Sequence, residues 1–228
     1  GTNTVNAIRS IETFLVPPRW LFVRVETSEG LTGWGEASLE GHGEAVTGAF
    51  ASLRDRFIGA DADRIEDIWQ TAYRLGFYRG GPVLMSALSG LDQALWDIKG
   101  KSLGVPVAQL LGGKVRDAIR VYSWIGGDDP ASVKEEAEVR KSQGFDTVKM
   151  NATGALARLD SRTALDGVVE RVSLVREAGM DVAVDFHGRV HKPMAKQLAQ
   201  ALEPLAPLFI EEPLLSEQPA EIAELARR

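Results

Sequence analysis

The 228-residue chain contains no cysteine and no long uninterrupted apolar segment. Without cysteine the chain cannot form disulfides, carry out thiol chemistry or build a cysteine-based zinc site. No apolar run approaches the roughly 20 residues that a membrane-spanning helix needs, and the first residues lack the pattern of a signal peptide. We therefore expect a protein with no membrane partner and a cytoplasmic location.

An excess of positive charge is also absent. Lysine and arginine number 26 against 32 aspartate and glutamate residues, which gives a net charge of −6. This balance argues against nucleic acid as the main partner. The hydrophobic fraction of 44% is that of an ordinary globular protein, and the length allows one large or two modest domains.

The first half of the chain reads as an α+β domain, assigned to residues 1–117. Residues 20–26 alternate apolar and polar side chains, residues 27–30 form a turn, and residues 31–36 resume the strand pattern. We also expect a strand at 6–16 and helices at about 43–58, 64–76 and 82–99. In the last of these, apolar residues recur at helical spacing after Pro82, and the pattern breaks at residues 103–106.

The second half, residues 118–228, repeats a strand and a helix four times. We predict strand–helix pairs at 119–124 and 130–142, at 145–150 and 161–178, at 181–186 and 192–203, and at 207–210 and 217–228. Such a series predicts a parallel sheet with crossover helices. It fits either a small doubly wound sheet or the first half of a (β/α)8 barrel. The last helical pattern ends without a capping signal, which favours half a barrel in a partial chain.

Ionisable side chains stand where successive predicted strands end. Lys149 lies at the end of the second strand of this half, Asp185 and His187 at the end of the third, and Glu211 at the end of the fourth. In a barrel these ends meet at one face, where active sites lie. Asp185 and Glu211 would stand on neighbouring strands, and two such carboxylates repel unless a proton or a cation joins them. Oxygen ligands without cysteine favour Mg²⁺ over Zn²⁺.

Each of these residues also has a simpler structural explanation. Asp185 lies close to Gly188 and could cap a turn, Glu211 could be a solvated loop acid, and His187 could be a structural histidine. Lys149 could extend to water from a strand end. Their joint occurrence at successive strand ends is what indicates an active site.

At these residues the sequence resembles the enolase superfamily, and within it the mandelate racemase-like acid-sugar dehydratases. The stretch DFHGR is the more specific signal, whereas FIEEP marks only the superfamily. The family fold is an α+β capping domain over a (β/α)7β barrel, of which this chain would contain about the first half. The resemblance is carried by PPRW at 17–20, GFYRGG at 76–81, LDQALWDIKGK at 91–101, DFHGR at 185–189 and FIEEP at 209–213.

The resemblance implies a role for each residue at the strand ends. Asp185 and Glu211 would be the first two Mg²⁺ ligands, and Lys149 would polarise the substrate carboxylate. His187 would be the general acid that protonates the leaving hydroxyl. Asn151 stands where racemases of the superfamily carry a second lysine; an amide cannot act as that base, so Asn151 is expected to contact substrate instead.

The activity implied by the resemblance is Mg²⁺-dependent dehydration of a sugar acid, with D-galactonate as the first expected substrate, to a 2-keto-3-deoxy acid. Arg19, Tyr78 and Arg79 would belong to lid loops that contact the substrate. The third metal ligand and the general base would lie beyond residue 228. The alternatives are dehydration or epimerisation of another aldonate, or an inactive fragment that serves only in binding or assembly. The resemblance also suggests a homo-oligomer.

Overall fold

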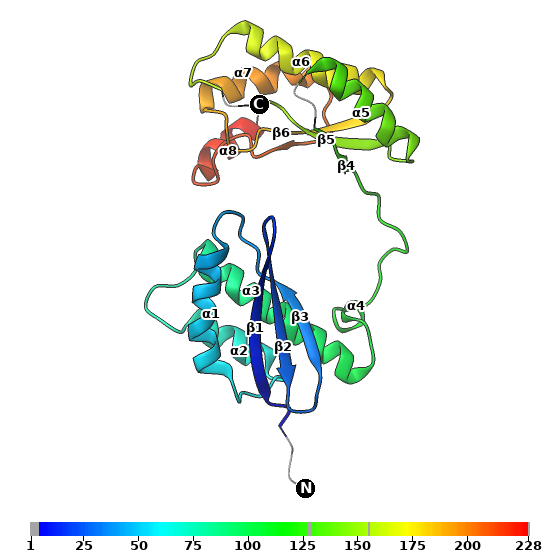
Figure 1. Ribbon diagram of the computed structural model, residues 1–228. Helices are drawn as coiled ribbons and strands as arrows, with labels where there is room; N and C mark the ends of the chain where they lie inside the picture. The colour runs from blue at the N-terminus through cyan, green and yellow to red at the C-terminus, as the bar shows by residue number, and fades with distance from the viewer. Residues whose placement is uncertain (1–4, 127–128, 155, 228) are drawn as a thin grey trace. The chain divides into compact units, whose positions relative to one another are not determined.

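A computed structural model describes residues 5–126, 129–154 and 156–227. The chain divides into two compact units, Gly1–Asp117 and Ala118–Arg228, which follow one another along the ribbon in Figure 1. Each unit has its own hydrophobic core. Within the described residues, no helix combines the length and apolarity needed to cross a bilayer.

The first unit contains a three-stranded antiparallel sheet in the order β1-β2-β3. The strands are β1 (Ile8–Val16), β2 (Trp20–Thr27) and β3 (Thr32–Glu36). The predicted alternation is confirmed, because Leu21, Val23 and Val25 of β2 are all buried. One face of the sheet therefore supplies the core.

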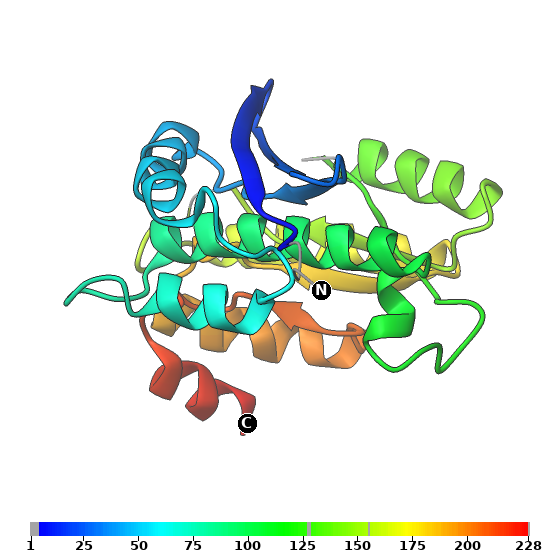
Figure 2. The same cartoon turned by 90° about the horizontal axis from the view of Figure 1, so that it is seen from below.

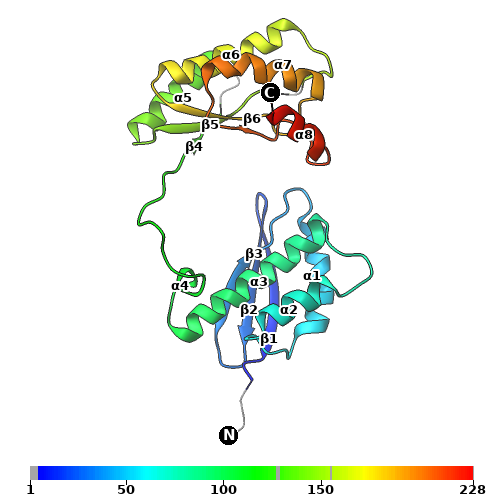
Figure 3. The ribbon, with the colours of Figure 1, turned by 180° about the vertical axis from the view of Figure 1, so that it is seen from behind.

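Helices pack on that apolar face (Figures 2 and 3). The unit contains α1 (Gly43–Phe57), α2 (Ile65–Tyr73), α3 (Pro82–Leu103) and the short α4 (Val107–Leu110). The longest helix, α3, begins at Pro82 and ends where Gly104 adopts a left-handed backbone, with φ +68°. The predicted break after residue 103 is therefore confirmed, and a glycine C-cap is its physical cause.

Glycines let α3 lie directly against β3. A Cβ atom at Gly33 would overlap the carbonyl oxygen of Ala94, and one at Gly35 would overlap that of Gly90. Because both obstacles are backbone atoms, a larger side chain could be accommodated only if the helix moved away from the strand. The first unit thus has a tightly packed seam between sheet and helix.

The second unit contains a parallel sheet in the order β4-β5-β6-β7. The strands are β4 (Ser123–Trp124), β5 (Thr147–Asn151), β6 (Asp181–Asp185) and β7 (Ile210–Glu211). The helices are α5 (Pro130–Ser142), α6 (Arg162–Glu177), α7 (Lys192–Leu202) and α8 (Pro219–Ala226), with a 3₁₀ turn at Glu203–Leu205. The spatial order follows the chain order without the reversal of a doubly wound sheet, so the half-barrel prediction is confirmed.

The sheet also curls as a barrel does. The rings of Tyr122 and Phe209, which precede β4 and β7, lie 5.9 Å apart although β5 and β6 separate their strands. Helices α5, α6 and α7 cover one face of the sheet (Figure 1). Val148, Val182 and Val184 pack in the core on that helical side.

Several predicted boundaries were wrong. The strand expected at 119–124 is only Ser123–Trp124, and the one expected at 207–210 is Ile210–Glu211. Both are edge strands of the described sheet, so each is paired only over the short stretch that its single neighbour reaches. Helix α8 begins at Pro219 rather than 217, since proline fits the first turn.

Candidate active site

The predicted site residues of the second unit share one face of its sheet. Asn151 is aligned with Asp185, and Asp185 with Glu211, in the parallel register. Lys149 precedes Asn151 by two residues and therefore points to the same side. Val148, Val182 and Val184 occupy the alternate positions of these strands and pack toward the helices, so the ionisable groups lie on the face opposite α5–α7.

A single ammonium group joins the two predicted metal-binding carboxylates. The Nζ atom of Lys149 lies 3.2 Å from Oδ2 of Asp185 and forms a closer ion pair with Oε2 of Glu211. The side chain of Asp185 is only 6% exposed and that of Lys149 only 16%, so little water screens their interaction. The ammonium group of Lys149 therefore partly balances the negative charge of both carboxylates.

These contacts govern the protonation states of the pair. Burial alone would lower the pKa of Lys149, but its bonds to Glu211 and Asp185 outweigh burial and raise that pKa. Burial alone would raise the pKa of Asp185, but bonds from His187 and Lys149 outweigh it and lower that pKa. Both groups are therefore charged at neutral pH.

His187 is held by the same aspartate. Its backbone N–H donates to Oδ1 of Asp185 at 2.7 Å, and its ring Nδ1 lies 3.1 Å from Oδ2. The backbone of His187 is left-handed, with φ +59°, and this turn brings the ring back over the strand end. Because Nδ1 faces Asp185, the other ring nitrogen, Nε2, remains for a substrate.

The loops after β6 and β7 are bonded to each other. The N–H of Gly188 donates to the carbonyl of Glu212 at 3.1 Å, and the N–H of Phe186 donates to that of Glu211 at 2.9 Å. Glu212 is also left-handed, with φ +44°. These two bonds keep the imidazole-bearing loop next to the acidic one.

Glu212 is a candidate ligand that the sequence interpretation missed. It forms a group with Asp185 and His187, in which one ligand atom of each residue lies within 4.8 Å of the others. The signal for it was the second acid of the stretch FIEEP, which was not assigned a role. Among the described residues, this group does not include the predicted ligand Glu211, whose carboxylate is bonded to Lys149 instead. The carboxylate oxygens of Asp185 and Glu212 are nevertheless ligands of the kind that Mg²⁺ prefers.

The three predicted lid residues belong to the first unit. The Nη1 atom of Arg19 lies 4.0 Å from Oε1 of Glu40, and its guanidinium stacks over the Trp20 ring at 5.7 Å. Arg79 donates from Nε to the carbonyl of Gly76 at 3.3 Å. Tyr78 is 91% exposed. Contact of these residues with substrate stays a prediction.

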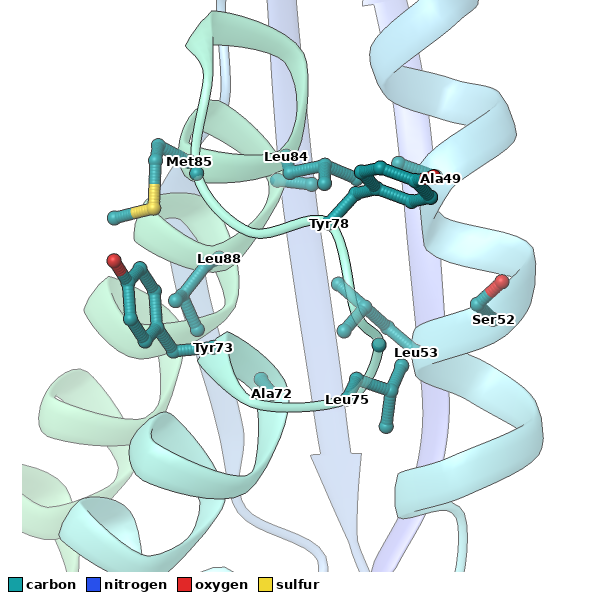
Figure 4. A pocket seen from close by; sticks show the side chains of 13 residues that line it. Ala49, Ser52, Leu53, Ala72, Tyr73, Leu75, Tyr78, Leu84, Met85 and Leu88 are labelled. Atoms are coloured by element: carbon teal, nitrogen blue, oxygen red, sulfur yellow. The ribbon is translucent and has the colours of Figure 1, made fainter.

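Tyr78 borders an apolar cavity of about 230 Å³ within the first unit. Figure 4 shows the side chains that line it, which come from α1, α2, α3 and the loop between α2 and α3. The lining is mainly aliphatic, with Leu53, Leu84 and Leu88 among its residues. It differs chemically from the charged cluster of the second unit.

Two family models match the chain. One, described as mandelate racemase / muconate lactonizing enzyme, N-terminal domain, matches residues 10–112. The other, described as enolase C-terminal domain-like, matches residues 132–228. Together they account for both units.

Similar proteins come from bacteria. The D-galactonate dehydratases of Ralstonia pickettii and Variovorax paradoxus are 53% and 52% identical over 222 residues, which is 96% of this chain and 58% of each relative. The chain thus spans a little over half the length of these curated relatives. Among solved structures, an enolase from Pantoea ananatis with bound D-gluconate and Mg has a TM-score of 0.87, with 31% identity over 97% of this chain and 63% of that one. A member of the enolase superfamily from Salmonella Typhimurium has a TM-score of 0.89, with 28% identity over 97% and 64%.

Proposed function

The chain belongs to the enolase superfamily, and we propose that the whole protein is a Mg²⁺-dependent dehydratase of sugar acids with D-galactonate as its substrate. The observation that carries this proposal is the contact of Asp185 with both Lys149 and His187 at the carboxyl edge of the sheet. One buried carboxylate thus links a charge-stabilising group to a proton donor. The names of the relatives support the choice of reaction and substrate.

The reaction begins with a difficult deprotonation. The hydrogen on the carbon next to a carboxylate is very weakly acidic, because its removal concentrates negative charge on the carboxylate oxygens. A bound Mg²⁺, held by Asp185 and Glu211, would supply positive charge at those oxygens. Lys149 would donate to the same carboxylate from its ammonium group, which the neighbouring acids keep protonated.

The second difficulty is the leaving group. Hydroxide leaves poorly, whereas water leaves readily once the hydroxyl oxygen accepts a proton. His187 would donate that proton from Nε2, while Asp185 fixes the ring through Nδ1. Asn151, on the same face, would orient the substrate through its amide. The balanced reaction converts the aldonate to a 2-keto-3-deoxy acid and one water.

Two alternatives concern the same site. The structural neighbour with bound D-gluconate favours dehydration of another aldonate as the second candidate. Epimerisation would need a second base on the opposite side of the substrate, and Asn151 cannot serve as one. The alternative that is not an enzyme is an inactive fragment that serves only in binding or assembly.

The test is a screen of aldonic acids with the whole protein and Mg²⁺, scored by formation of keto acid. We expect turnover of D-galactonate that is lost on removal of divalent metal. Turnover of D-gluconate but not of D-galactonate would assign D-gluconate as the substrate instead. If no aldonate is turned over, the proposal of a dehydratase is rejected. The 228-residue chain assayed alone should be inactive, because none of its proposed site residues serves as the base that removes the α-proton.

A further inference from the structure

Arg171 is a charged residue on the buried side of α6. It is 9% exposed. The positions that share its side of the helix are Leu165, Val168, Val172 and Val175. A buried guanidinium lowers stability unless its N–H groups find acceptors, so this position needs a physical explanation.

Two of its acceptors are backbone carbonyls at the end of β5. Nη1 donates to the carbonyl of Asn151 at 3.4 Å, and Nη2 donates to that of Ala152 at closer range. Nε donates to the carbonyl of Gly167, one turn back in its own helix, at 3.3 Å. Since Asn151 is the last residue of β5, the guanidinium binds the chain where the regular strand ends.

The same strand end carries the predicted active site on its other side. The N–H of Ala152 donates to the carbonyl of Asp185 at 2.8 Å. Lys149, three residues earlier, forms its ion pairs with Asp185 and Glu211 on the face away from the helices. Arg171 therefore binds this backbone segment from the helix side of the sheet, and Lys149 projects from the opposite face.

We propose that Arg171 is a positioning residue, which fixes the end of β5 through two carbonyls and so keeps Lys149 directed at Asp185 and Glu211. Its catalytic consequence rests on the proposed dehydratase function. A purely structural role predicts that replacing Arg171 by an apolar side chain of similar length leaves the end of β5 unchanged. Such a side chain would fill the same space with no loss of packing.

The experiment compares Arg171→Met with Arg176→Met, the same substitution in the same helix. Arg176 pairs with Asp181 at the opposite end of β6, with 2.9 Å between Nη1 and Oδ1. NMR measures amide hydrogen exchange in the whole protein and in each variant. We expect Arg171→Met to speed exchange at Ala152 about tenfold and to leave Val184 within about twofold, since only the strand end loosens. Arg176→Met should leave Ala152 unchanged.

Equal exchange at Ala152 in both variants would overturn the proposal, as would a uniform rise across the sheet. If Arg171→Met fails to fold, Arg171→Lys replaces it, because an ammonium group keeps the charge but cannot bind two carbonyls in the same fork. This variant should give an intermediate exchange rate at Ala152. A rate equal to that of the unmodified chain would refute the need for both bonds.

Turnover supplies an independent measurement. In the whole protein, Arg171→Met should lower kcat about tenfold or more with little change in KM, since it disturbs the reacting groups more than binding. Arg176→Met, even with a similar fall in Tm, should not. If no aldonate is turned over, the proposed function fails, whereas exchange at Ala152 still decides the positioning role.

Discussion

The Asp185 carboxylate holds His187 at two atoms, the backbone N–H at 2.7 Å and the ring Nδ1 at 3.1 Å. The residue that we propose as a metal ligand thus also sets the direction of the proposed acid. Because both bonds use the same carboxylate, moving Asp185 would move the imidazole as well.

The acid role of His187 predicts a separation of two chemical steps. In the whole protein, His187→Asn should lower dehydration by a factor of about 100 or more, because the hydroxyl loses its proton donor. Exchange of the α-proton with D₂O should persist, since it precedes that step. Keto-acid formation and deuterium incorporation are measured on the same samples.

His191→Asn is the matched control. His191 occupies the N-cap position of α7 without a side-chain capping bond, and asparagine is a favourable residue there. This variant should keep full dehydration and stability. Full turnover by His187→Asn would remove that residue from the acid role.

Removal of Lys149 should make the chain dependent on a divalent cation. Lys149→Met leaves Asp185 and Glu211 side by side without their ammonium group, and we expect a loss of about 3 kcal/mol in the free energy of unfolding. Mg²⁺ should then raise the Tm of the variant more than that of the unmodified chain. Thermal unfolding with and without Mg²⁺ measures both effects.

The double variant Lys149→Met with Glu211→Gln tests the cause. It removes one of the two repelling charges and should recover part of the stability lost by Lys149→Met alone. A double variant as unstable as the sum of the two single variants would show that repulsion is not the reason.

Acid should weaken the packing of α8 through Glu224. Bonds with Lys192 and Lys196 lower the pKa of Glu224 from 4.5 to about 2. A pKa lowered in the folded state stabilises the fold above the unfolded value, and this stabilisation is lost as the pH falls from 4.5 through about 2. Glu224→Gln should therefore show a shallower fall of Tm over this range.

The partner variant Lys192→Met should flatten the same part of the pH profile, because it removes one of the two cations. Added salt should reduce the difference between the unmodified chain and both variants, since the groups are exposed. If Tm falls with decreasing pH as steeply in both variants as in the unmodified chain, these ion pairs are not the cause of the fall.

The seam between β3 and α3 predicts a sign difference between two glycine substitutions. Gly33→Ala would drive a methyl group into the carbonyl of Ala94, so we expect a destabilisation of about 1–3 kcal/mol. Gly48→Ala, within α1, meets no atom within 4 Å and should stabilise by about 0.5–1 kcal/mol. Denaturant unfolding compares the two, and equal effects would argue against the close seam.

Much of the fold could be predicted from local patterns. The alternation at 20–26 predicted β2 because one face of that strand is buried and the other is not. The repeated strand–helix pattern predicted a parallel sheet, because parallel strands need crossover connections. The convergence of Lys149, Asp185 and Glu211 followed from the same rule, which brings the carboxyl ends of such strands together.

Other features depend on contacts between distant residues and left no readable pattern. The left-handed turn at His187 and the contact of Tyr122 with Phe209 arise only after the sheet has formed and curled. Arg171 looks like any arginine of an amphipathic helix until its acceptors at Asn151 and Ala152 are known. The lengths of β4 and β7 were missed for the same reason, because pairing with a neighbour defines them.

The division of the chain after residue 117 bears on how it folds during synthesis. The first unit completes its core from residues that have already left the ribosome, while the parallel strands are still being made. The ion pair of Lys149 with Glu211 must wait for 62 further residues (211 − 149 = 62), or about 3–12 s of translation. Nascent Lys149 therefore stands without Glu211 for seconds, a window in which a chaperone has access to the unfinished sheet.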